Sequence, residues 1–515
     1  MNRSKARFRR FWHRYQLPFI VFLTGAAVLI IEVVATRILS PYFGNTLYTV
    51  SSVLGVVLAA LSVGYYLGGR LADKHPEKPL FFTIILLGGI SVLCLQLLLQ
   101  LWLPSIGYEL SIVSGPLISS LLLFFLPGFL LGMLSPFAIK LQEKQLAGTG
   151  IGTIAGEMFF WSTMGSIAGS LSAGFLLVPF IGINLTVIGV GSFLCVLGAL
   201  PLLLKRLHVA VVVKLFAVAA FLGIFTVSLV LAERQEVLYR ADGIYEKLTI
   251  TDYHKKGRPV RSFQQDRSSS SAMYLDSDEL VYDYTKYYEL YKNIKPNARR
   301  SLVIGGAAYS IPKALLADSP AMQVDVAEIE PSLEALAKKY FRLPETQRIK
   351  THVVDGRRWL ATSGITYDVI FSDVYYSLYS IPAHFTTKEF FETAKRQLSE
   401  NGVFIANVIG ELSLEHPSFT YSELKTFRSV FPNGYLFAVE SPKSHLSQNL
   451  IFVGINGSAC LDFSAPPLKQ STNEVLRSLA SHETTVAEAA LASYPLLTDN
   501  YAPVEYMMSK QLSKQ

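Results

Sequence analysis

Four groups of residues between positions 301 and 373 have types and spacing that suit a nucleoside site. Gly305-Gly306 follows a short apolar run, and glycines at such a point let the backbone approach a ligand closely. Glu328 comes about 20 residues later, where an acid can accept both hydroxyls of a ribose. Asp355-Gly356 could take an adenine amino group, and Asp373 stands where a reacting amine would lie. The ordered set predicts binding of a nucleotide-like ligand.

Short apolar runs must position these residues. Three of them are residues 301–304, 324–329 and 367–372, and a further run leads to Asp355. Helical patterns separate the runs, and the first of these patterns begins near Ser310. Short apolar strands that alternate with helices form a parallel sheet with its functional groups at the C-terminal edge. We therefore expect an α/β domain over residues 296–515, with Glu328 at an exposed strand end; an open sheet whose acids only cap helices is the alternative.

The rest of the chain has a different composition. A length of 515 residues is too great for one core, and hydrophobic residues make up 51% of the chain, concentrated in residues 17–232. The net charge of +7 is small for this length. Its cations lie between apolar runs, which favours orientation of a membrane domain over nucleic-acid binding. The three cysteines are widely separated and predict no disulfide framework or metal site.

Residues 17–232 hold seven apolar runs, each long enough to cross a bilayer. Residues 1–16 form a basic tail that should stay in the cytoplasm, and loops near 70–78, 140–144 and 205–208 are also basic. Glycines and serines in the fifth run suit close helix packing. The runs lie at about 17–39, 48–69, 79–101, 112–138, 151–180, 184–204 and 209–231, and the small residues of the fifth are Ser162, Gly165, Ser166 and Gly169.

These features conflict over the side of the membrane on which residues 233–515 lie. Basic loops place the amino terminus inside, so seven crossings would leave the C-terminal domain outside. A nucleotide-derived cosubstrate is found in the cytoplasm. We therefore predict a multi-pass protein of the cell (plasma or inner) membrane with a cytoplasmic C-terminal domain. This requires that the glycine-broken 151–180 run, or the 209–231 run with its Lys214, does not cross fully.

A small β-rich unit is expected between the membrane domain and the α/β domain. Residues 237–282 show short stretches of β-like alternation, and a tyrosine-rich helical segment follows from Tyr282. An aromatic stripe usually packs in a core, but beside acids it can line a cation site. We place this unit, with its helix, at residues 233–295.

With these motifs in this order, residues 237–455 resemble the spermidine synthase (polyamine aminopropyltransferase) family, in particular its membrane-fused branch. The resemblance implies a β-rich unit followed by a Rossmann-like, methyltransferase-type fold. It also implies that residues 381–391 form a flap over the active site, and residues 497–505 resemble a tail of membrane-fused members. The implied roles are donor binding for Gly305, Gly306, Glu328, Asp355 and Gly356, catalysis for Asp373, and substrate binding for Tyr245, Tyr282, Tyr284 and Tyr376.

Departures from the family pattern fall on the amine half of the implied site. Ala308 stands where the family has an aspartate, and Tyr376 stands where it has a second aspartate after the catalytic one. Ser270 replaces a glutamine, and Glu246 ends an element that in the family reads Ser-x-Tyr-Gln. Losing two acids weakens charge pairing with a polyamine, whereas the nucleoside half is better preserved.

The resemblance implies a membrane-bound aminopropyltransferase of polyamine biosynthesis that uses decarboxylated S-adenosylmethionine and an amine acceptor. One alternative is a methyltransferase-like enzyme using S-adenosylmethionine, because Ala308 removes a negative charge that would repel its carboxylate. Another is a non-catalytic nucleoside- or polyamine-binding domain coupled to a transporter-like membrane domain. The expected partners are the lipid bilayer and a small-molecule amine, with a homodimer left open. We expect no tightly bound cofactor, no metal and no nucleic acid.

Overall fold

The computed structural model of this protein describes residues 2–107, 109–111, 113–146, 148–205, 209–233, 237–266, 268–374 and 381–512. The chain forms two compact units that divide after residue 236. Each unit has its own core.

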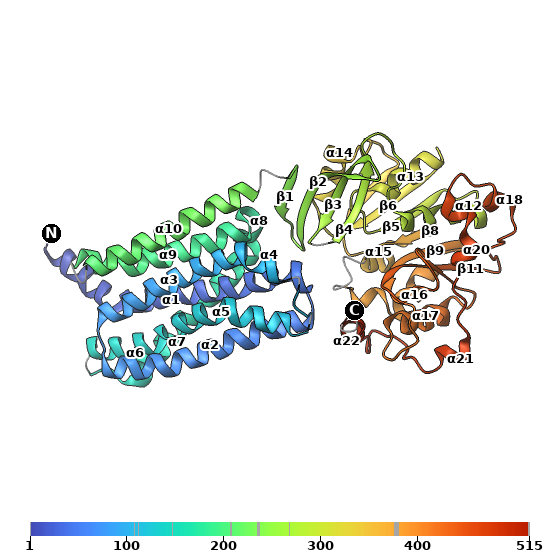
Figure 1. Ribbon diagram of the computed structural model, residues 1–515. Coiled ribbons are helices and arrows are strands. Elements are labelled where there is room, and N and C mark those ends of the chain that lie inside the picture. Colours follow the sequence, from blue (N-terminus) through green and yellow to red (C-terminus); the bar gives the residue numbers. More distant parts are fainter. Residues whose placement is uncertain are drawn as a thin grey trace. The chain divides into compact units, whose positions relative to one another are not determined.

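The first unit is a bundle of long helices (Figure 1). Within the described residues, seven helical stretches are long and apolar enough to cross a membrane, which confirms the seven predicted spans and a multi-pass protein. The elements are α1 (Asn2–Phe43), α2 (Leu47–Lys74), α3 (Lys78–Leu101), α4 (Leu103–Ile106), α5 (Gly115–Gly132), α6 (Leu134–Gln145), α7 (Ile151–Ser172), the π-helical turn η1 (Ala173–Leu177), α8 (Val178–Ile181), α9 (Ile183–Leu204) and α10 (Val209–Glu233).

Small residues bring α1 and α7 into close contact, as the sequence predicts. A side chain on Gly165 or Gly169 would collide with backbone carbonyl groups of α1. The hydroxyl of Ser166 donates a hydrogen bond to the carbonyl oxygen of Gly25 at 3.3 Å. Because glycines here allow two backbones to approach, they stabilise the helix pair and do not interrupt α7.

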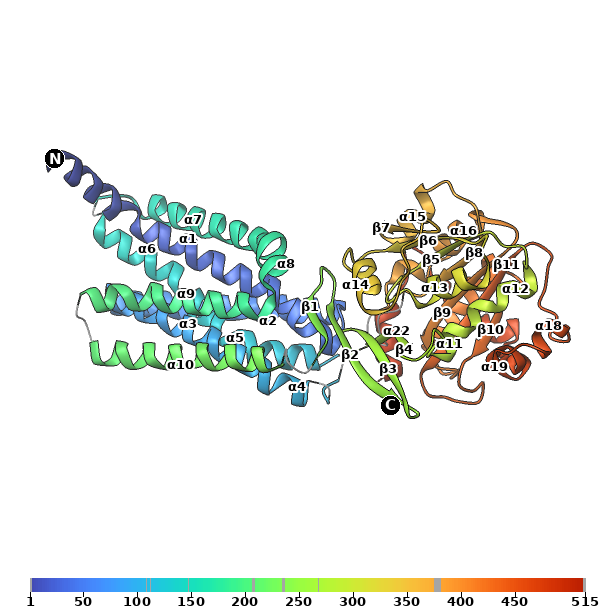
Figure 2. The same cartoon turned by 90° about the horizontal axis from the view of Figure 1, so that it is seen from above.

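The expected interruption of the fifth or seventh run is absent. Residues 151–181 form one continuous helical stretch of 31 residues, and α10 has 25 residues. Both are long enough to cross a bilayer, so helix length gives no reason for either to be re-entrant. The start of α1 and the end of α10 lie at opposite ends of the bundle (Figures 1 and 2).

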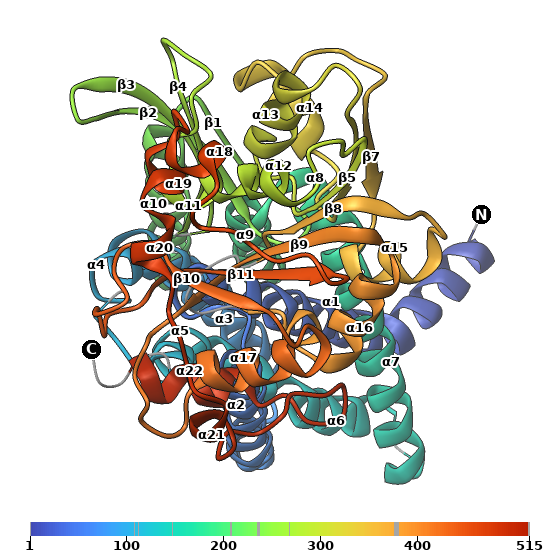
Figure 3. The same ribbon diagram turned by 90° about the vertical axis from the view of Figure 1, so that its right-hand side faces the viewer.

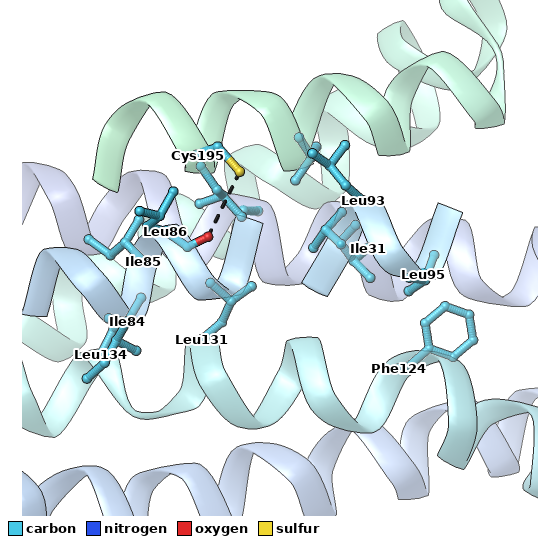
Figure 4. Close-up of a cluster of buried hydrophobic side chains, with 14 of the residues drawn as sticks. Ile31, Ile84, Ile85, Leu86, Leu93, Leu95, Phe124, Leu131, Leu134 and Cys195 are labelled. Atoms are coloured by element: carbon cyan, nitrogen blue, oxygen red, sulfur yellow. Dashed lines mark hydrogen bonds between the residues drawn. The ribbon is translucent and has the colours of Figure 1, made fainter. Parts of the chain in front are cut away.

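Apolar side chains fill the bundle and also cover its outside. Figure 4 shows Leu86 of α3, Leu131 of α5 and Cys195 of α9 converging in the interior. On the outside, large apolar side chains are widely exposed, with Phe180 at 81% and Phe175 at 73%. A helical surface of this kind is suited to contact with lipid rather than water.

The second unit contains two sheets. The larger has seven strands in the order β10-β11-β9-β8-β5-β6-β7, and its strands β5 to β9 pair in parallel. The smaller sheet is antiparallel, in the order β1-β2-β3-β4. The strands are β1 (Tyr239–Asp242), β2 (Lys247–Lys255), β3 (Arg258–Gln265), β4 (Ser268–Tyr274), β5 (Arg300–Ile304), β6 (Gln323–Glu328), β7 (Ile349–Val353), β8 (Tyr367–Ser372), β9 (Leu398–Gly410), β10 (Tyr435–Ala438) and β11 (Gln448–Asn456).

Helices cover both faces of the larger sheet. Successive residues of β5 alternate between faces, so Val303 joins one apolar cluster while Leu302 and Ile304 join the other. Figure 3 shows α13 and α14 on one side of the strands and α16 and α17 on the other. The helical elements are α11 (Asp283–Lys286), η3 (Tyr287–Leu290), α12 (Tyr291–Ile294), α13 (Ser310–Asp318), α14 (Leu333–Tyr340), α15 (Gly356–Thr362), η4 (Ala383–Phe385), α16 (Lys388–Arg396), α17 (Phe419–Val430), α18 (Pro466–Lys469), α19 (Glu474–Arg477), α20 (Leu479–His482), α21 (Glu488–Leu491) and α22 (Val504–Leu512).

One face of the small sheet shares a core with the large sheet, and Val260, Ala272, Tyr274 and Val281 form a small separate cluster. Leu248, Ile250 and Phe263 of β2 and β3 pack into the same apolar cluster as Val303 of the large sheet. The small and the large sheet lie in one compact unit, Val237–Gln515. The parallel strand order with helices on both faces is that of a Rossmann-like, methyltransferase-type fold.

Candidate active site

A cavity of about 810 Å³ runs along one edge of the large sheet. Parallel strands all present their C-terminal ends at this edge, and the antiparallel β11 begins there. From β7 to β11 the edge spans about 20–25 Å, because neighbouring strands are separated by about 4.8 Å. In strand order, the cavity is lined by Asp355 and Gly356 after β7, Glu328 of β6, Gly305 after β5, Asp373 after β8, Asn407 of β9 and Asn449 of β11.

The glycine turn after β5 is built by backbone geometry. Gly305 has a φ of +87°, and a Cβ at this position would collide with the carbonyl oxygen of Asp373. Ala307 and Tyr309 also have positive φ values, of 45° and 59°. Gly305 and Ala307 line the cavity, whereas Gly306 does not and instead donates its N–H to Glu328. Of the two predicted glycines, the structure therefore brings only Gly305 to the cavity wall.

Glu328 lies at the cavity but is buried, with 5% of its surface exposed, so the predicted exposed strand end was wrong. Its Oε2 accepts N–H groups from Gly306 at 2.7 Å and Ala307 at 3.3 Å. Its Oε1 accepts the N–H of Glu330 at 2.8 Å. Burial raises the pKa of Glu328, although these hydrogen bonds act in the opposite direction. The carboxylate is buried because the glycine turn folds over it.

Asp355 combines a helix-cap role with a place on the cavity wall. Its Oδ1 accepts the N–H of Arg358 at 2.9 Å, which caps α15, and its Oδ2 lies 3.0 Å from Nε2 of His384. Burial opposes ionisation, but the His384 contact and the helix N–H groups together hold the pKa of Asp355 below its usual value. The alternative of a helix-capping acid thus holds for Asp355, which also lines the cavity beside Gly356.

Asp373 lies near the middle of the edge and is held by amide side chains. Nδ2 of Asn407 donates to its Oδ1 at 2.9 Å, and Nδ2 of Asn449 donates to Oδ1 of Asn407 at 2.9 Å. Burial raises the pKa of Asp373 to about 6, while the hydrogen bond from Asn407 and the nearby hydroxyl of Tyr284 partly offset the rise. This carboxylate is mostly ionised at neutral pH and can take up a proton within the physiological range.

Two of the four predicted substrate tyrosines reach the cavity. The rings of Tyr282 and Tyr284 are stacked with centroids 6.0 Å apart, and both line the wall. The hydroxyl of Tyr284 donates to the carbonyl oxygen of Ser270 at 3.2 Å. Tyr245 is 44% exposed and is not part of the wall, because the loop between β1 and β2 carries it to the surface. Tyr376 lies outside the described residues.

The positions that depart from the family pattern have different surroundings. Ala308 is 4% exposed and packs in the core rather than on the cavity wall. Ser270 lines the cavity, and its buried hydroxyl has no hydrogen-bond partner among the described residues. Glu246 is not part of the wall. No described side chain at these positions therefore supplies a carboxylate to the cavity.

Several cavity residues were not predicted from the sequence. Asn407 is an amide inside the apolar run 403–409, and this pattern could have marked it. Lys255 lines the wall, donates to the carbonyl oxygen of Val281 at 3.2 Å, and lies 4.9 Å from the ring centroid of Tyr282. Lys255 forms no ion pair with any described residue. Phe385, in the segment that resembles the family's flap, also reaches the wall.

Within the described part of the chain, no group of three or more His, Cys, Asp and Glu side chains is arranged to hold a metal ion. The cavity instead combines acids, amides, hydroxyls and one amine along a strand edge. Such a wall can bind a polar organic ligand and move a proton at Asp373.

Comparison with known proteins identifies related sequences for this unit and beyond. Residues 288–460 match the family model "Spermine/spermidine synthase domain". Over 216 residues the chain is 26% identical to the polyamine aminopropyltransferase of Vibrio vulnificus, covering 39% of this chain and 68% of that one. Over 226 residues it is 30% identical to a probable polyamine aminopropyl transferase of Bifidobacterium longum, covering 41% of this chain and about half (49%) of that one.

A third relative extends across both units. The chain is 22% identical over 449 residues to the polyamine aminopropyltransferase 2 of Aquifex aeolicus, covering 83% of this chain and 85% of that one. The second unit begins only after residue 236, so a match of this length must include part of the helical unit. The similarity to that protein therefore spans parts of both units of this chain.

Proposed function

We propose that this protein is a membrane-bound aminopropyltransferase. The proposal rests on residues 288–460, which match the spermine/spermidine synthase family. The donor would be decarboxylated S-adenosylmethionine, and the acceptor a small amine. The nucleoside part of the donor would lie over β5, β6 and β7, beside Gly305, Glu328 and Asp355. The acceptor would lie over β9 and β11.

The observation that carries this proposal is the position and chemistry of Asp373. It stands between the two ends of the cavity, and burial raises its pKa to about 6. An attacking amine must lose a proton as its nitrogen forms a bond, and a carboxylate with such a pKa can accept that proton at neutral pH. Nδ2 of Asn407 fixes the carboxylate by donating a hydrogen bond to Oδ1 of Asp373.

The reaction needs positioning more than covalent chemistry by the protein. The acceptor nitrogen attacks the carbon beside the sulfonium, the carbon–sulfur bond breaks in line, and neutral methylthioadenosine leaves. The nitrogen then gives up one proton, which Asp373 accepts. Holding the two reactants in one cavity contributes through proximity and orientation. Tyr282 and Tyr284 would line the path of the cationic chain and attract it with their ring faces.

The test uses the full chain purified in detergent. Calorimetry should detect binding of decarboxylated S-adenosylmethionine and of methylthioadenosine, and turnover with a diamine should release methylthioadenosine. Product should depend on Asp373, so Asp373→Asn is the matched inactive variant. Failure of the wild-type protein to bind either nucleoside would refute the enzyme proposal and leave a protein of another kind.

Lys255 favours a second candidate, in which the donor is S-adenosylmethionine itself. Its amine lies in the cavity wall without an ion-pair partner among the described residues, and Ala308 contributes no carboxylate. An ammonium group without an ion-pair partner can pair with the carboxylate that decarboxylated S-adenosylmethionine lacks. If S-adenosylmethionine is the donor, Lys255→Met should weaken its binding more than the binding of decarboxylated S-adenosylmethionine. Lys256→Met, one residue along and outside the cavity wall, is the control. Equal effects on both donors would exclude this candidate.

The side of the membrane on which the second unit lies gives a further test of the proposed donor. The basic tail and loops, with seven helices, predict a second unit on the outer side, whereas a donor made in the cytoplasm requires this unit inside. We propose the inner position for the enzyme. A reporter active only inside, fused after Gln515, should then give signal, and one that folds only outside should not. The reverse result would refute use of a cytoplasmic donor.

A further inference from the structure

The segment that follows α21 makes side-chain contacts with the starts of two helices, α15 and α16. The carboxylate of Asp499 binds the guanidinium of Arg357 in a fork, with Nη1 to Oδ1 at 2.7 Å and Nη2 to Oδ2 at 2.5 Å. Its Oδ1 also accepts the hydroxyl of Thr387 at 2.9 Å. Arg357 lies in the first turn of α15 and Thr387 caps α16. One side chain thus joins three segments that are distant in the sequence.

Backbone contacts hold the same segment in place. The N–H of Lys388 donates to the carbonyl oxygen of Leu497 at 2.9 Å, and the N–H of Leu497 donates to the hydroxyl of Thr426 at 2.8 Å. The N–H of Asp499 donates to Oε2 of Glu389 at 3.0 Å. Leu497 is fully buried. These bonds fix the backbone of the segment at Asp499, whose side chain is 47% exposed, and so set where its carboxylate meets Arg357.

Arg357 passes this constraint to the cavity. Its Nη1 also donates to the carbonyl oxygen of His384 at 2.9 Å, and Nε2 of His384 lies 3.0 Å from Oδ2 of Asp355. The residues beside these groups, Gly356 and Phe385, line the cavity together with Asp355. Asp355 is therefore linked to Asp499 by three hydrogen bonds, through Arg357 and His384, and Gly356 and Phe385 are the chain neighbours of those two residues.

We propose that Asp499 is a positioning residue for the nucleoside end of the cavity. Through Arg357 it fixes the turn at Asp355 and Gly356 against the turn that carries Phe385. A bidentate pair between Arg and a carboxylate holds both orientation and distance, which a single contact would not. The inference rests on the proposed function, because it assumes that this end of the cavity receives the nucleoside. Asp499 does not line the cavity, so its effect on binding acts through Arg357.

The experiment compares Asp499→Asn with the wild-type full chain in detergent. We expect about a tenfold rise in the Kd of methylthioadenosine by calorimetry and a similar rise in the KM of the donor. The kcat and the acid limb of its pH profile should not change, because Asp373 is not touched. Asp462→Asn, at an exposed aspartate whose carboxylate hydrogen-bonds to Ser464 within the described residues, is the matched control and should leave all four quantities unchanged.

A second variant separates positioning from loss of folding. Arg357→Lys keeps the charge but loses the fork, so it should raise the same Kd and KM, and its effect should not add to that of Asp499→Asn. If both variants fold, as judged by thermal unfolding, and bind methylthioadenosine like the wild type, the positioning role is refuted. If the wild-type protein itself fails to bind, the proposed function fails instead.

Discussion

The two ends of the cavity are built in different ways. At the nucleoside end the acids are held by backbone N–H groups: Glu328 accepts three of them and Asp355 caps α15. At the amine end, side chains bond to side chains, as in the chain from Asn449 to Asn407 to Asp373. The first end therefore depends mainly on turns close to each strand, with the Arg357–Asp499 pair as a long-range contact, and the second on residues that only the folded sheet brings together. A substitution at the first end should disturb structure, and one at the second should disturb chemistry.

The largest expected effect belongs to the point where the two ends meet. Asp373→Asn removes the proton acceptor but keeps the size of the side chain, so donor binding should persist while kcat falls by about 10²–10⁴, the usual range for a lost general base. Stopped-time assays of methylthioadenosine release, with calorimetry of the donor, check both quantities. Unchanged turnover would show that Asp373 is not the acceptor and would remove the chemical distinction between the two ends.

At the nucleoside end, Glu328→Ala tests whether one side chain supports both the stability of the fold and the binding of the donor. The substitution leaves the N–H groups of Gly306, Ala307 and Glu330 without their acceptor, which should lower the free energy of unfolding by about 2–4 kcal/mol. Donor binding should be lost as well, since the glycine turn is no longer held. Chemical denaturation of the full chain in detergent gives the first quantity and calorimetry the second. A variant as stable as the wild type would mean that the turn does not depend on Glu328.

The same comparison explains how far the sequence could be interpreted. The apolar runs that became β5, β6 and β8 were predicted because each is bounded by glycine or an acid, and the seven apolar runs because their length matches a bilayer. The burial of Glu328 was not predicted, because periodicity does not show which turn folds over a strand end. The continuous helix through residues 151–181 was not predicted for a related reason. The spacing of glycines alone does not show whether they allow two helices to pack closely or interrupt one helix.

The amine end was predicted least well. Tyr245 was assigned from a resemblance in a loop, and that loop carries it to the surface. Lys255 and Asn449 reach the cavity from β2 and β11, which are separated by almost 200 residues, and nothing local in the sequence marks their meeting. Of the residues that were not predicted, Asn407 had a local signal, as an amide in an apolar strand. Sites made from side chains of distant strands depend on sheet order, which the sequence does not display.

A smaller effect concerns the stability cost of keeping a carboxylate at the centre. The folded-state pKa of Asp373 is raised from 3.8 to about 6, so the folded protein retains this proton to higher pH than the unfolded chain does. The contribution of Asp373 to the free energy of unfolding is fully present below pH 3.8. It falls as the pH rises towards 6 and stays low above pH 6. Asp373→Asn should therefore increase the free energy of unfolding at pH 7 by up to about 2–3 kcal/mol.

Thermal unfolding of the full chain at several pH values checks this expectation. The gain from Asp373→Asn should be largest at pH 7 and should disappear well below pH 3.8, where Asp373 is protonated in both the folded and the unfolded chain. Glu328→Gln serves as a contrast, because Glu328 is also buried but is compensated by backbone N–H groups. A gain that did not vary with pH would show that the effect comes from packing and not from ionisation.

The smallest effect should come from Asn407, which belongs wholly to the amine end. Its Nδ2 donates to Asp373 and lowers the pKa of that carboxyl against the effect of burial. Asn407→Leu keeps the volume but removes this donor, so the pKa of Asp373 should rise above about 6 and less of the carboxylate should be ionised at neutral pH. We expect the acid limb of the kcat profile to move to higher pH, with a loss of activity at pH 7 of a few fold that is recovered at pH 8–9. The KM of the donor should not change, because the nucleoside end is built independently. A profile that stayed in place while KM rose would contradict this separation, since it would make Asn407 a binding residue rather than one that sets the ionisation of Asp373.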